Sequence, residues 1–378
     1  MTSEKNILIV SKSADPGGLE FHVLDLIKGF SDANKVYLMV PDGTLVDSYK
    51  NAGAEVILFY PKSSLDIDFI KKTYEFCKKY RIHIVHANEL INSQAVFSAF
   101  LAGVYKRVYH VHTPFLYWKY SNIFIKLVKT IPNWIINFIT ANFFSTDVIC
   151  LTPQIKTHRI VNELIWPSKL KVIPNAVPVE KLAHKPLYED LNVIKQKYGI
   201  PLNKVIIGTI SRLSREKGHM SLLKSFDKLN KEKPNVYFLL LAGGGDLEEE
   251  YEKYAEEHFS KSYCITGKFE ENEKIQLLYS IDYAVFPSLA EGFGYVLTEF
   301  MSAQIPTLAS DLPVLKYVGG TGIWYFRRGD YLDLYSNLNN ILIMSDALIN
   351  EKTSKAFKEV QKYSIEAFIQ NYSVIYGN

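Results

Sequence analysis

The segment VPVEKLAHKPLYEDLNVIKQKYGIPLNK (residues 177–204) runs directly into the apolar stretch VIIGTIS (residues 205–211). The first is charged and contains prolines, as connections between domains often do. The second favours a β-strand, and from it an alternation of strands and helices starts again. Because 378 residues are too many for one ordinary core, the sequence predicts two domains that meet at this connection.

Both halves contain short apolar runs separated by stretches with helical spacing. Such runs are typical of parallel strands covered by helices on both faces. The sequence therefore predicts an α/β protein with two doubly wound, Rossmann-like domains, residues 1–176 with a returning C-terminal helix over 361–378, and residues 177–360. The predicted strands are NILIV (6–10), KVYLMV (35–40), EVILF (55–59), IHIVHA (82–87), RVYHVH (107–112), DVICL (147–151), KVIIGTIS (204–211), VYFLLLAG (236–243), YCITG (263–267), YAVFPS (283–288) and PTLAS (306–310). Ligands of such sheets bind beyond the carboxyl ends of the strands, so a cleft between the domains is the expected site.

Composition excludes several other classes of protein. The 43 basic and 40 acidic residues give a net charge of only +3, which argues against a nucleic-acid partner. Cys77, Cys150 and Cys264 form no CxxC pair and indicate a reducing, cytoplasmic compartment. We expect no signal peptide, and the uncharged segment 130–146 is short and polar for a membrane span.

Gly17 and Gly18 lie in SKSADPGGLEFHV (residues 11–23), between the first predicted strand and a helical pattern. Paired glycines allow backbone N–H groups at a helix N-terminus to approach an anion. The alternative is a tight turn without a ligand.

Arg212 and Lys217 lie in GTISRLSREKG (residues 208–218), between a predicted strand and the next helix. An arginine fork and a lysine point charge can together hold a diphosphate. The alternative is a pair of solvated surface charges. The glycines of LAGGGDLEEE (residues 241–250) depart from GxGxxG and are a weaker indication of a phosphate site.

Two glutamates lie in SLAEGFGYVLTEF (residues 288–300). If a helix begins near Gly294, Glu291 lies in the loop before it and Glu299 in its second turn. Carboxylates accept hydrogen bonds from sugar hydroxyls, and the helix N-terminus offers N–H groups to a phosphate. One nucleotide sugar would satisfy all three features. The alternative is that neither glutamate binds a ligand: one, in the first turn, interacts favourably with the helix dipole, and the other is an ordinary surface residue.

In combination, these motifs resemble the retaining glycosyltransferases of family 4, which have the GT-B fold of two Rossmann-like domains facing across a cleft. EGFGYVLTE matches the Glu-x7-Glu signature of that family, SRLSREKG its Arg-x4-Lys-Gly element, and GGLEFHVLDLIKGF is similar to its N-terminal glycine loop and helix. VIPNAV and ASDLP resemble two further elements of the family. The resemblance covers nearly the whole chain.

The resemblance implies transfer of a sugar from a UDP- or GDP-sugar to a saccharide or lipid-linked saccharide, with retention of configuration, in polysaccharide or glycoconjugate biosynthesis. It places Glu291 at the donor sugar, Glu299 at the ribose, and Arg212 and Lys217 at the diphosphate. The implied donor-binding residues also include Gly17, Gly18, Gly292, Phe293 and Gly294.

His112, in YHVHTPF (residues 109–115), matches the histidine that the family places near the reaction centre. His110 is the alternative on the same strand, and His86 is another candidate at a strand end. No cofactor and no metal are expected. The D-x-D sequence at Asp66 and Asp68 lies at a predicted helix start, where aspartate serves as a cap.

The sequence departs from the family at two places. Phe300 stands where the family usually has alanine, and Gln304 precedes Ile305-Pro306 where a glycine is usual. These changes concern packing behind the site, and they leave the identity of the donor undecided. Two other functions also stay open, a non-hydrolysing nucleotide-sugar epimerase and a catalytically silent scaffold subunit of the same fold.

Residues 113–145 combine many aromatic side chains with Lys119, Lys126 and Lys129 and contain no acidic residue. Aromatics with lysines suit a membrane interface, so a peripheral membrane contact or a lipid-linked acceptor is one interpretation. A pair of core helices with surface lysines is the other.

Overall fold

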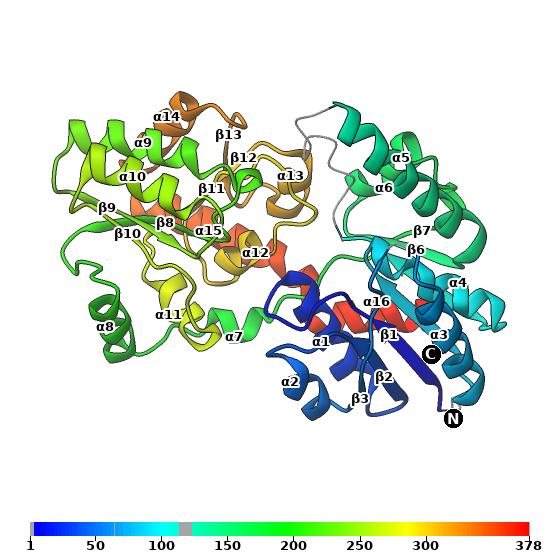
Figure 1. The fold of residues 1–378 in the computed structure, drawn as a ribbon. Coiled ribbons are helices and arrows are strands. Elements are labelled where there is room, and N and C mark those ends of the chain that lie inside the picture. The colour runs from blue at the N-terminus through cyan, green and yellow to red at the C-terminus, as the bar shows by residue number, and fades with distance from the viewer. Residues whose placement is uncertain (1–3, 64, 113–122, 378) are drawn as a thin grey trace. The chain divides into compact units, whose positions relative to one another are not determined.

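The computed structural model describes residues 4–63, 65–112 and 123–377, which form two compact units (Figure 1). The first comprises Met1–Ala176 and Ile365–Asn378, and the second Val177–Ser364. Residues 361–364, which the sequence analysis assigned to the returning C-terminal segment, belong to the second unit. The reason is local, because the Tyr363 carbonyl accepts a 2.8 Å hydrogen bond from the Val177 N–H.

The first unit contains a seven-stranded parallel sheet in the order β3-β2-β1-β4-β5-β6-β7. The strands are β1 (Asn6–Val10), β2 (Lys35–Val40), β3 (Ala54–Leu58), β4 (Ile84–Asn88), β5 (Lys106–His110), β6 (Asp147–Cys150) and β7 (Leu170–Val172). β7 was not predicted from the sequence, because a strand of three residues carries too little pattern. The order reverses between β1 and β4, which places the topological switch point of this sheet there.

Helices of the first unit pack on this sheet (Figure 1). They are α1 (Gly18–Phe30), α2 (Val46–Asn51), α3 (Ile67–Lys79), α4 (Ser93–Leu101), α5 (Ile123–Ile139), α6 (Pro153–Asn162) and α16 (Ile365–Tyr376), with the short turns η1 (Leu90–Asn92), η3 (Thr140–Phe144) and η4 (Pro167–Lys169). Helix α16 packs against α1 so closely that a Cβ on Gly29 would lie 2.6 Å from Ile369. Asp66 caps α3 by accepting from the Phe69 N–H at 3.0 Å, as expected of that aspartate.

The second unit contains a six-stranded parallel sheet in the order β10-β9-β8-β11-β12-β13. Its strands are β8 (Val205–Ile210), β9 (Tyr237–Ala242), β10 (Tyr263–Ile265), β11 (Tyr283–Phe286), β12 (Thr307–Ser310) and β13 (Trp324–Phe326). The three-residue β13 was missed for the same reason as β7. The switch point lies between β8 and β11.

The segment expected as a connection holds the first two helices of the second unit. Its helices are α7 (Val179–Ala183), α8 (Tyr188–Lys197), α9 (His219–Glu232), α10 (Glu248–Phe259), α11 (Lys274–Tyr279), α12 (Tyr295–Ser302), α13 (Pro313–Gly319), α14 (Tyr331–Ile341) and α15 (Asp346–Val360), with the turns η5 (Arg215–Lys217), η6 (Glu271–Glu273) and η7 (Gln361–Tyr363). Across the residues described in both units, no helix is both long and apolar enough to cross a bilayer.

Candidate functional site

In the second unit, the candidate residues follow the two strands that flank the switch point. Arg212 and Lys217 follow β8, and Glu291 follows β11. The carboxyl ends of neighbouring parallel strands meet at one edge of the sheet, so the fold itself brings these segments together. The spacing in sequence, 74 residues between Lys217 and Glu291, gives no hint of this pairing.

Lys217 and Glu291 form an ion pair at the centre of this edge. Lys217 Nζ lies 2.5 Å from Glu291 Oε1, and the side chains are only 19% and 10% exposed. The Ser288 hydroxyl donates to the same carboxylate oxygen at 2.9 Å. A carboxylate held by one cation and one hydroxyl keeps lone pairs for a further donor, such as a sugar hydroxyl.

The two loops that carry this ion pair are also joined through their backbones. The N–H groups of Leu289 and Ala290 point to the Glu216 carbonyl, at 2.7 and 3.3 Å. Gly218 adopts φ +69°, and a Cβ there would lie 2.2 Å from the Pro287 carbonyl oxygen. A larger residue at position 218 would therefore push the loops apart, which explains the glycine after Lys217 in physical terms.

Arg212 differs from Lys217 in its exposure. Its side chain is 79% exposed, and its contact with Glu216 is long, at 3.5 Å. Such a surface pair contributes little, so the guanidinium can turn toward a ligand at small cost.

The glycines after β9 support the loop that carries Arg212. Cβ atoms on Gly243 and Gly245 would lie 2.1 and 2.5 Å from the carbonyl oxygens of Ser211 and Leu213. The Leu213 N–H donates to the Gly244 carbonyl at 3.0 Å. These glycines therefore allow close backbone packing beside Arg212, a use that the weak GxGxxG resemblance did not reveal.

The loop-to-helix transition predicted near Gly294 is confirmed. Gly294 is the N-cap of α12 with φ +91°, Glu291 lies in the preceding loop, and Glu299 lies in the second turn. The ring of Phe293 is buried edge-on against Tyr363 at 5.2 Å. A contribution of Phe293 to phosphate binding would therefore come from its backbone N–H, as would that of buried Gly292.

Glu299 belongs to a second buried ion pair that the sequence analysis missed. Lys274 Nζ lies 2.5 Å from Glu299 Oε1, with the glutamate side chain 5% exposed. Burial alone would lower the pKa of Lys274, but the carboxylates of Glu299 and Glu271 outweigh it and raise that pKa. Burial, opposed by Lys274, also raises the pKa of Glu271. Lys274 therefore stays charged and fixes one oxygen of Glu299.

The other carboxylate oxygen, Glu299 Oε2, is buried and has no hydrogen-bond partner among the described residues. An unsatisfied buried acceptor is costly, and a ligand hydroxyl would satisfy it.

In the first unit, α1 begins at Gly18, with Gly17 as an extended N-cap. A Cβ on Gly18 would meet no atom of the described residues within 4 Å, whereas a Cβ on Gly17 would lie 2.5 Å from Glu20 Oε2. Burial raises the pKa of Glu20, against the lowering effects of its backbone hydrogen bond and Lys12. A carboxyl group thus lies at the helix end where the sequence predicts a phosphate.

His112 lies just beyond β5, partly buried, while His110 and His86 on the strands are fully buried. His112 Nε2 is 3.3 Å from Asn88 Oδ1. Burial, with His22 and His86 nearby, holds the pKa of His112 well below its usual range, so the ring is neutral. Its greater exposure favours His112 over His110 as the residue that meets a substrate.

The buried side chain of Arg159 on α6 fixes the backbone just before His112. Its Nη2 donates to the Val111 carbonyl at 2.7 Å, and its Nη1 lies 3.3 Å from Glu163. Asn137 donates to the same glutamate oxygen at 2.8 Å. Nothing in the sequence signals this network, because a buried arginine on a helix has the same local pattern as a surface arginine.

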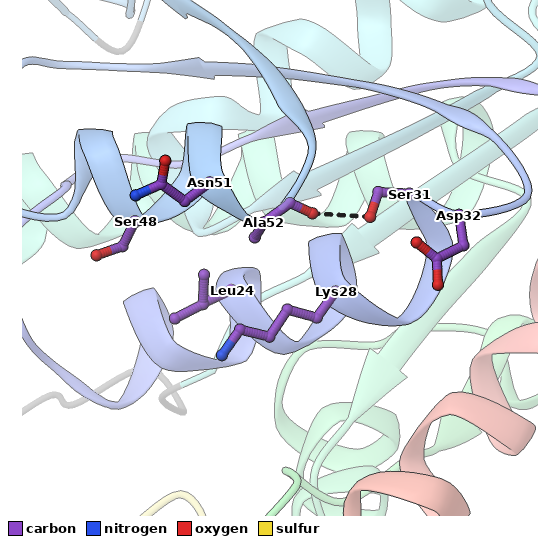
Figure 2. Close-up of a pocket in the computed structure, with 7 residues that line it drawn as sticks. All are labelled: Leu24, Lys28, Ser31, Asp32, Ser48, Asn51 and Ala52. Carbon is purple, nitrogen blue, oxygen red and sulfur yellow. Dashed lines mark hydrogen bonds between the residues drawn. The ribbon is translucent and has the colours of Figure 1, made fainter.

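A shallow pocket between α1 and α2 lies apart from all the candidate residues (Figure 2). Leu24, Lys28 and Ser31 line it on the α1 side, and the Ser31 hydroxyl donates to the Ala52 carbonyl at 2.7 Å. These residues belong to the last turns of the two helices, at the edge of the sheet opposite the strand carboxyl ends. The pocket therefore does not match the position where doubly wound sheets bind ligands.

Two family models match the chain, and together they cover most of it. One, described as "Glycosyltransferase Family 4", matches residues 16–181. The other, described as "Glycosyl transferases group 1", matches residues 191–359. The second match includes all strands of the second sheet, and the first includes all strands of the first sheet except β1.

Among curated proteins, the chain is 23% identical over 329 residues to the UDP-Gal:alpha-D-GlcNAc-diphosphoundecaprenol alpha-1,3-galactosyltransferase of Escherichia coli, covering 84% of this chain and 80% of that protein. It is 24% identical over 323 residues to the alpha-monoglucosyldiacylglycerol synthase of Streptococcus pneumoniae, covering 79% and 70%. Among solved structures, Anabaena HepE in complex with UDP-glucose matches with a TM-score of 0.81 at 20% identity, over 99% of this chain and 100% of the other.

Proposed function

Because the chain belongs to the family 4 glycosyltransferases of the GT-B fold, we propose that it transfers a sugar from a UDP- or GDP-sugar to a lipid-linked saccharide with retention of configuration. The observation that carries the proposal is the Lys217–Glu291 pair at the switch point of the second sheet. It places a fixed cation, which can bind a diphosphate, beside a carboxylate with lone pairs that can accept from a sugar hydroxyl.

Each part of the donor has a matching group in the second unit. Lys217 and Arg212 neutralise the diphosphate, and N–H groups at the start of α12 bind a phosphate oxygen. Glu291 accepts hydrogen bonds from the sugar, and Glu299 from the ribose. Stabilising charge on the leaving diphosphate, rather than forming a covalent intermediate, is then the main work of the protein.

Retention follows if the acceptor attacks the face of the sugar from which the diphosphate leaves. The bond from the anomeric carbon to the phosphate oxygen breaks, and a bond from that carbon to the acceptor oxygen forms. The acceptor proton passes to the leaving phosphate. His112 from the first unit is the residue we assign to the donor sugar near this centre. NMR of the product tests the step, because an α-linked donor must give an α-linked product, and a β-linked product would contradict it.

The diphosphate is expected to need no divalent cation. Two basic side chains already supply charge for it, and the D-x-D sequence is used as a helix cap. After a brief EDTA treatment, the transfer rate should stay within about twofold, a difference of under about 1 kcal/mol. Assays with and without added Mn²⁺ or Mg²⁺ check this. Loss of activity that either ion restores would mean that a metal bridges the phosphates.

An exposed apolar surface in the first unit supports a lipid-linked acceptor. The α5 patch, as we call it, has side chains that are 38% to 54% exposed, namely Ile131, Ile135, Ile139, Phe143, Leu164 and Trp166. The first three recur every four residues on α5 and so share one helix face. Phe143 packs edge-on against Trp166 at 5.3 Å.

Exposed apolar patches of this kind mark contact sites, and an aromatic-aliphatic face suits the membrane interface. The two curated relatives carry names that specify a diphosphoundecaprenol-linked sugar and a glucosyldiacylglycerol. We therefore propose that the α5 patch rests on the bilayer that holds the acceptor. The lysines proposed to join the membrane contact are Lys119, Lys126 and Lys129. Lys119 lies outside the described residues, as do the side chains of Lys126 and Lys129.

Polar substitution of the α5 patch should weaken membrane binding. Ile135→Asn with Ile139→Asn removes two apolar anchors, so affinity for anionic vesicles should fall at least about tenfold. Vesicle co-sedimentation measures this, with nucleotide binding unchanged. The control is Val193→Asn with Ile343→Asn, two apolar residues of the second unit that are more exposed than Ile135 and Ile139. Equal vesicle affinity of both double variants would remove the α5 patch from the account.

A further inference from the structure

Three fully buried histidines of the first unit gather around one point. They are His22 on α1, His86 on β4 and His110 on β5. Their ring centroids are 4.9 to 6.0 Å apart. One ring nitrogen from each lies within 4.8 Å of those offered by the other two. The glycosyl transfer proposed above assigns no role to these three side chains.

Each ring uses one nitrogen and leaves the other without a partner. His22 Nδ1 lies 3.0 Å from Asn175 Oδ1. His86 Nδ1 lies 2.7 Å from Tyr376 Oη, and His110 Nδ1 lies 3.4 Å from Tyr372 Oη. All three Nε2 atoms are buried and have no hydrogen-bond partner among the described residues. Buried polar atoms are nearly always paired, so three unpaired nitrogens on neighbouring rings are unusual and leave lone pairs for a further partner.

The outer hydrogen bonds determine which nitrogen can bind that partner. An amide oxygen only accepts, so His22 must donate from Nδ1 to Asn175, which leaves a lone pair on Nε2. The tyrosine hydroxyls can accept from His86 and His110 in the same way. Histidine ligands of metals characteristically donate their other ring N–H to an oxygen, which fixes the ring and its tautomer.

We propose that His22, His86 and His110 bind one transition-metal ion through Nε2, with Zn²⁺ as the best match and water as the fourth ligand. Imidazole nitrogen suits zinc and its neighbours, whereas Mg²⁺ and Ca²⁺ prefer oxygen. The pKa of His22 is lowered by burial to about 3, so its ring is neutral, as a metal ligand must be. Zn–N bonds of about 2.0–2.1 Å require the nitrogens to approach one another to about 3.3 Å, from separations of up to 4.8 Å.

Such an ion would be structural. It would join α1, β4 and β5 directly, and α16 through Tyr372 and Tyr376, so it would hold the C-terminal helix on the sheet. This role is separate from a cation on the donor diphosphate. A brief EDTA treatment removes a loosely held Mg²⁺ or Mn²⁺, whereas an ion enclosed by buried rings leaves slowly. The proposal of a buried zinc site and the prediction of metal-independent transfer can therefore fail independently.

The test is metal analysis of the full chain, purified from zinc-supplemented culture without a histidine tag. Mass spectrometry of the metal should find about one zinc per chain. The variant His86→Asn keeps an atom where Nδ1 meets Tyr376 and removes Nε2, so it should lose most of the zinc. The matched control, His258→Asn, changes a surface histidine of α10 and should retain it.

Two measurements on the unmodified protein keep the proposal falsifiable if the variant does not fold. Prolonged chelation should lower the unfolding temperature, and Zn²⁺ should restore it. Co²⁺ added to the chelated protein should give the visible absorption of a tetrahedral site. Zinc-free protein that gives no cobalt spectrum and no zinc-dependent stabilisation would overturn the proposal. Equal zinc in His86→Asn and His258→Asn would overturn it as well.

Discussion

Glu291→Gln should reduce sugar transfer about ten- to hundredfold while leaving the affinity for free UDP or GDP nearly unchanged. A charged hydrogen-bond acceptor contributes about 1.5–3 kcal/mol, and only a ligand that contains the sugar can lose this contribution. Glutamine keeps the size of the side chain and can still accept from Ser288. Calorimetry with the nucleoside diphosphate and with the nucleotide sugar, beside a transfer assay, measures the difference.

Glu299→Gln is the informative comparison for this prediction. If Glu299 binds the ribose, the free nucleotide and the nucleotide sugar should both bind more weakly, and to similar extents. Glu249→Gln, on the exposed side of α10, is the control for charge alone. Should Glu291→Gln weaken the free nucleotide as much as the sugar-bearing one, the assignment of Glu291 to the sugar is wrong.

Replacing both Arg212 and Lys217 by alanine should weaken binding of the nucleoside diphosphate by at least about a hundredfold. Each charge-assisted contact contributes about 1.5–3 kcal/mol, and the two act on the same diphosphate. Lys217→Ala also leaves the Glu291 carboxylate without its cation, which adds repulsion of the phosphates. Calorimetry of the double variant measures the loss.

Arg215→Ala serves as the matched control, because it removes an exposed cation from the same turn. Its affinity for the nucleoside diphosphate should stay within about twofold of the unmodified protein, since a general surface charge contributes little. Circular dichroism must show the same fold in all variants. Equal losses in Arg215→Ala and in the double variant would mean that diffuse charge, rather than a defined clamp, holds the nucleotide.

The sequence was sufficient to predict the fold because strands and helices alternate with a clear period. It also placed Glu291 before a helix and Glu299 within it, since Gly292 and Gly294 mark the turn. The structure shows Gly294 at φ +91°, a backbone conformation that favours glycine. Strands β7 and β13 were not predicted, because three residues are too few to show a recognisable strand pattern.

Long-range pairings could not be predicted. Lys274 lies 25 residues from Glu299, in a segment with several charges, and nothing local distinguishes it. His22, His86 and His110 lie on one helix and two strands, so whether they lie close together depends on the order and register of the strands. Only the sheet order β1-β4-β5 makes them neighbours.

The two departures from the family find physical explanations. Phe300 is fully buried on α12, so it changes packing behind the helix rather than its polar face. Gln304 adopts φ +55°, the left-handed conformation that a glycine would reach without strain. The family's usual glycine at this position is thus explained by the sharp turn between α12 and β12.

The most direct test of the account is transfer by the full chain from radiolabelled UDP- and GDP-sugars to polyprenyl diphosphate-linked saccharides in vesicles. We predict that label from one donor moves into the lipid phase, with one nucleoside diphosphate released for each sugar transferred. Release of an epimerised nucleotide sugar, or no turnover and no nucleotide binding by the folded protein, would contradict the central claim.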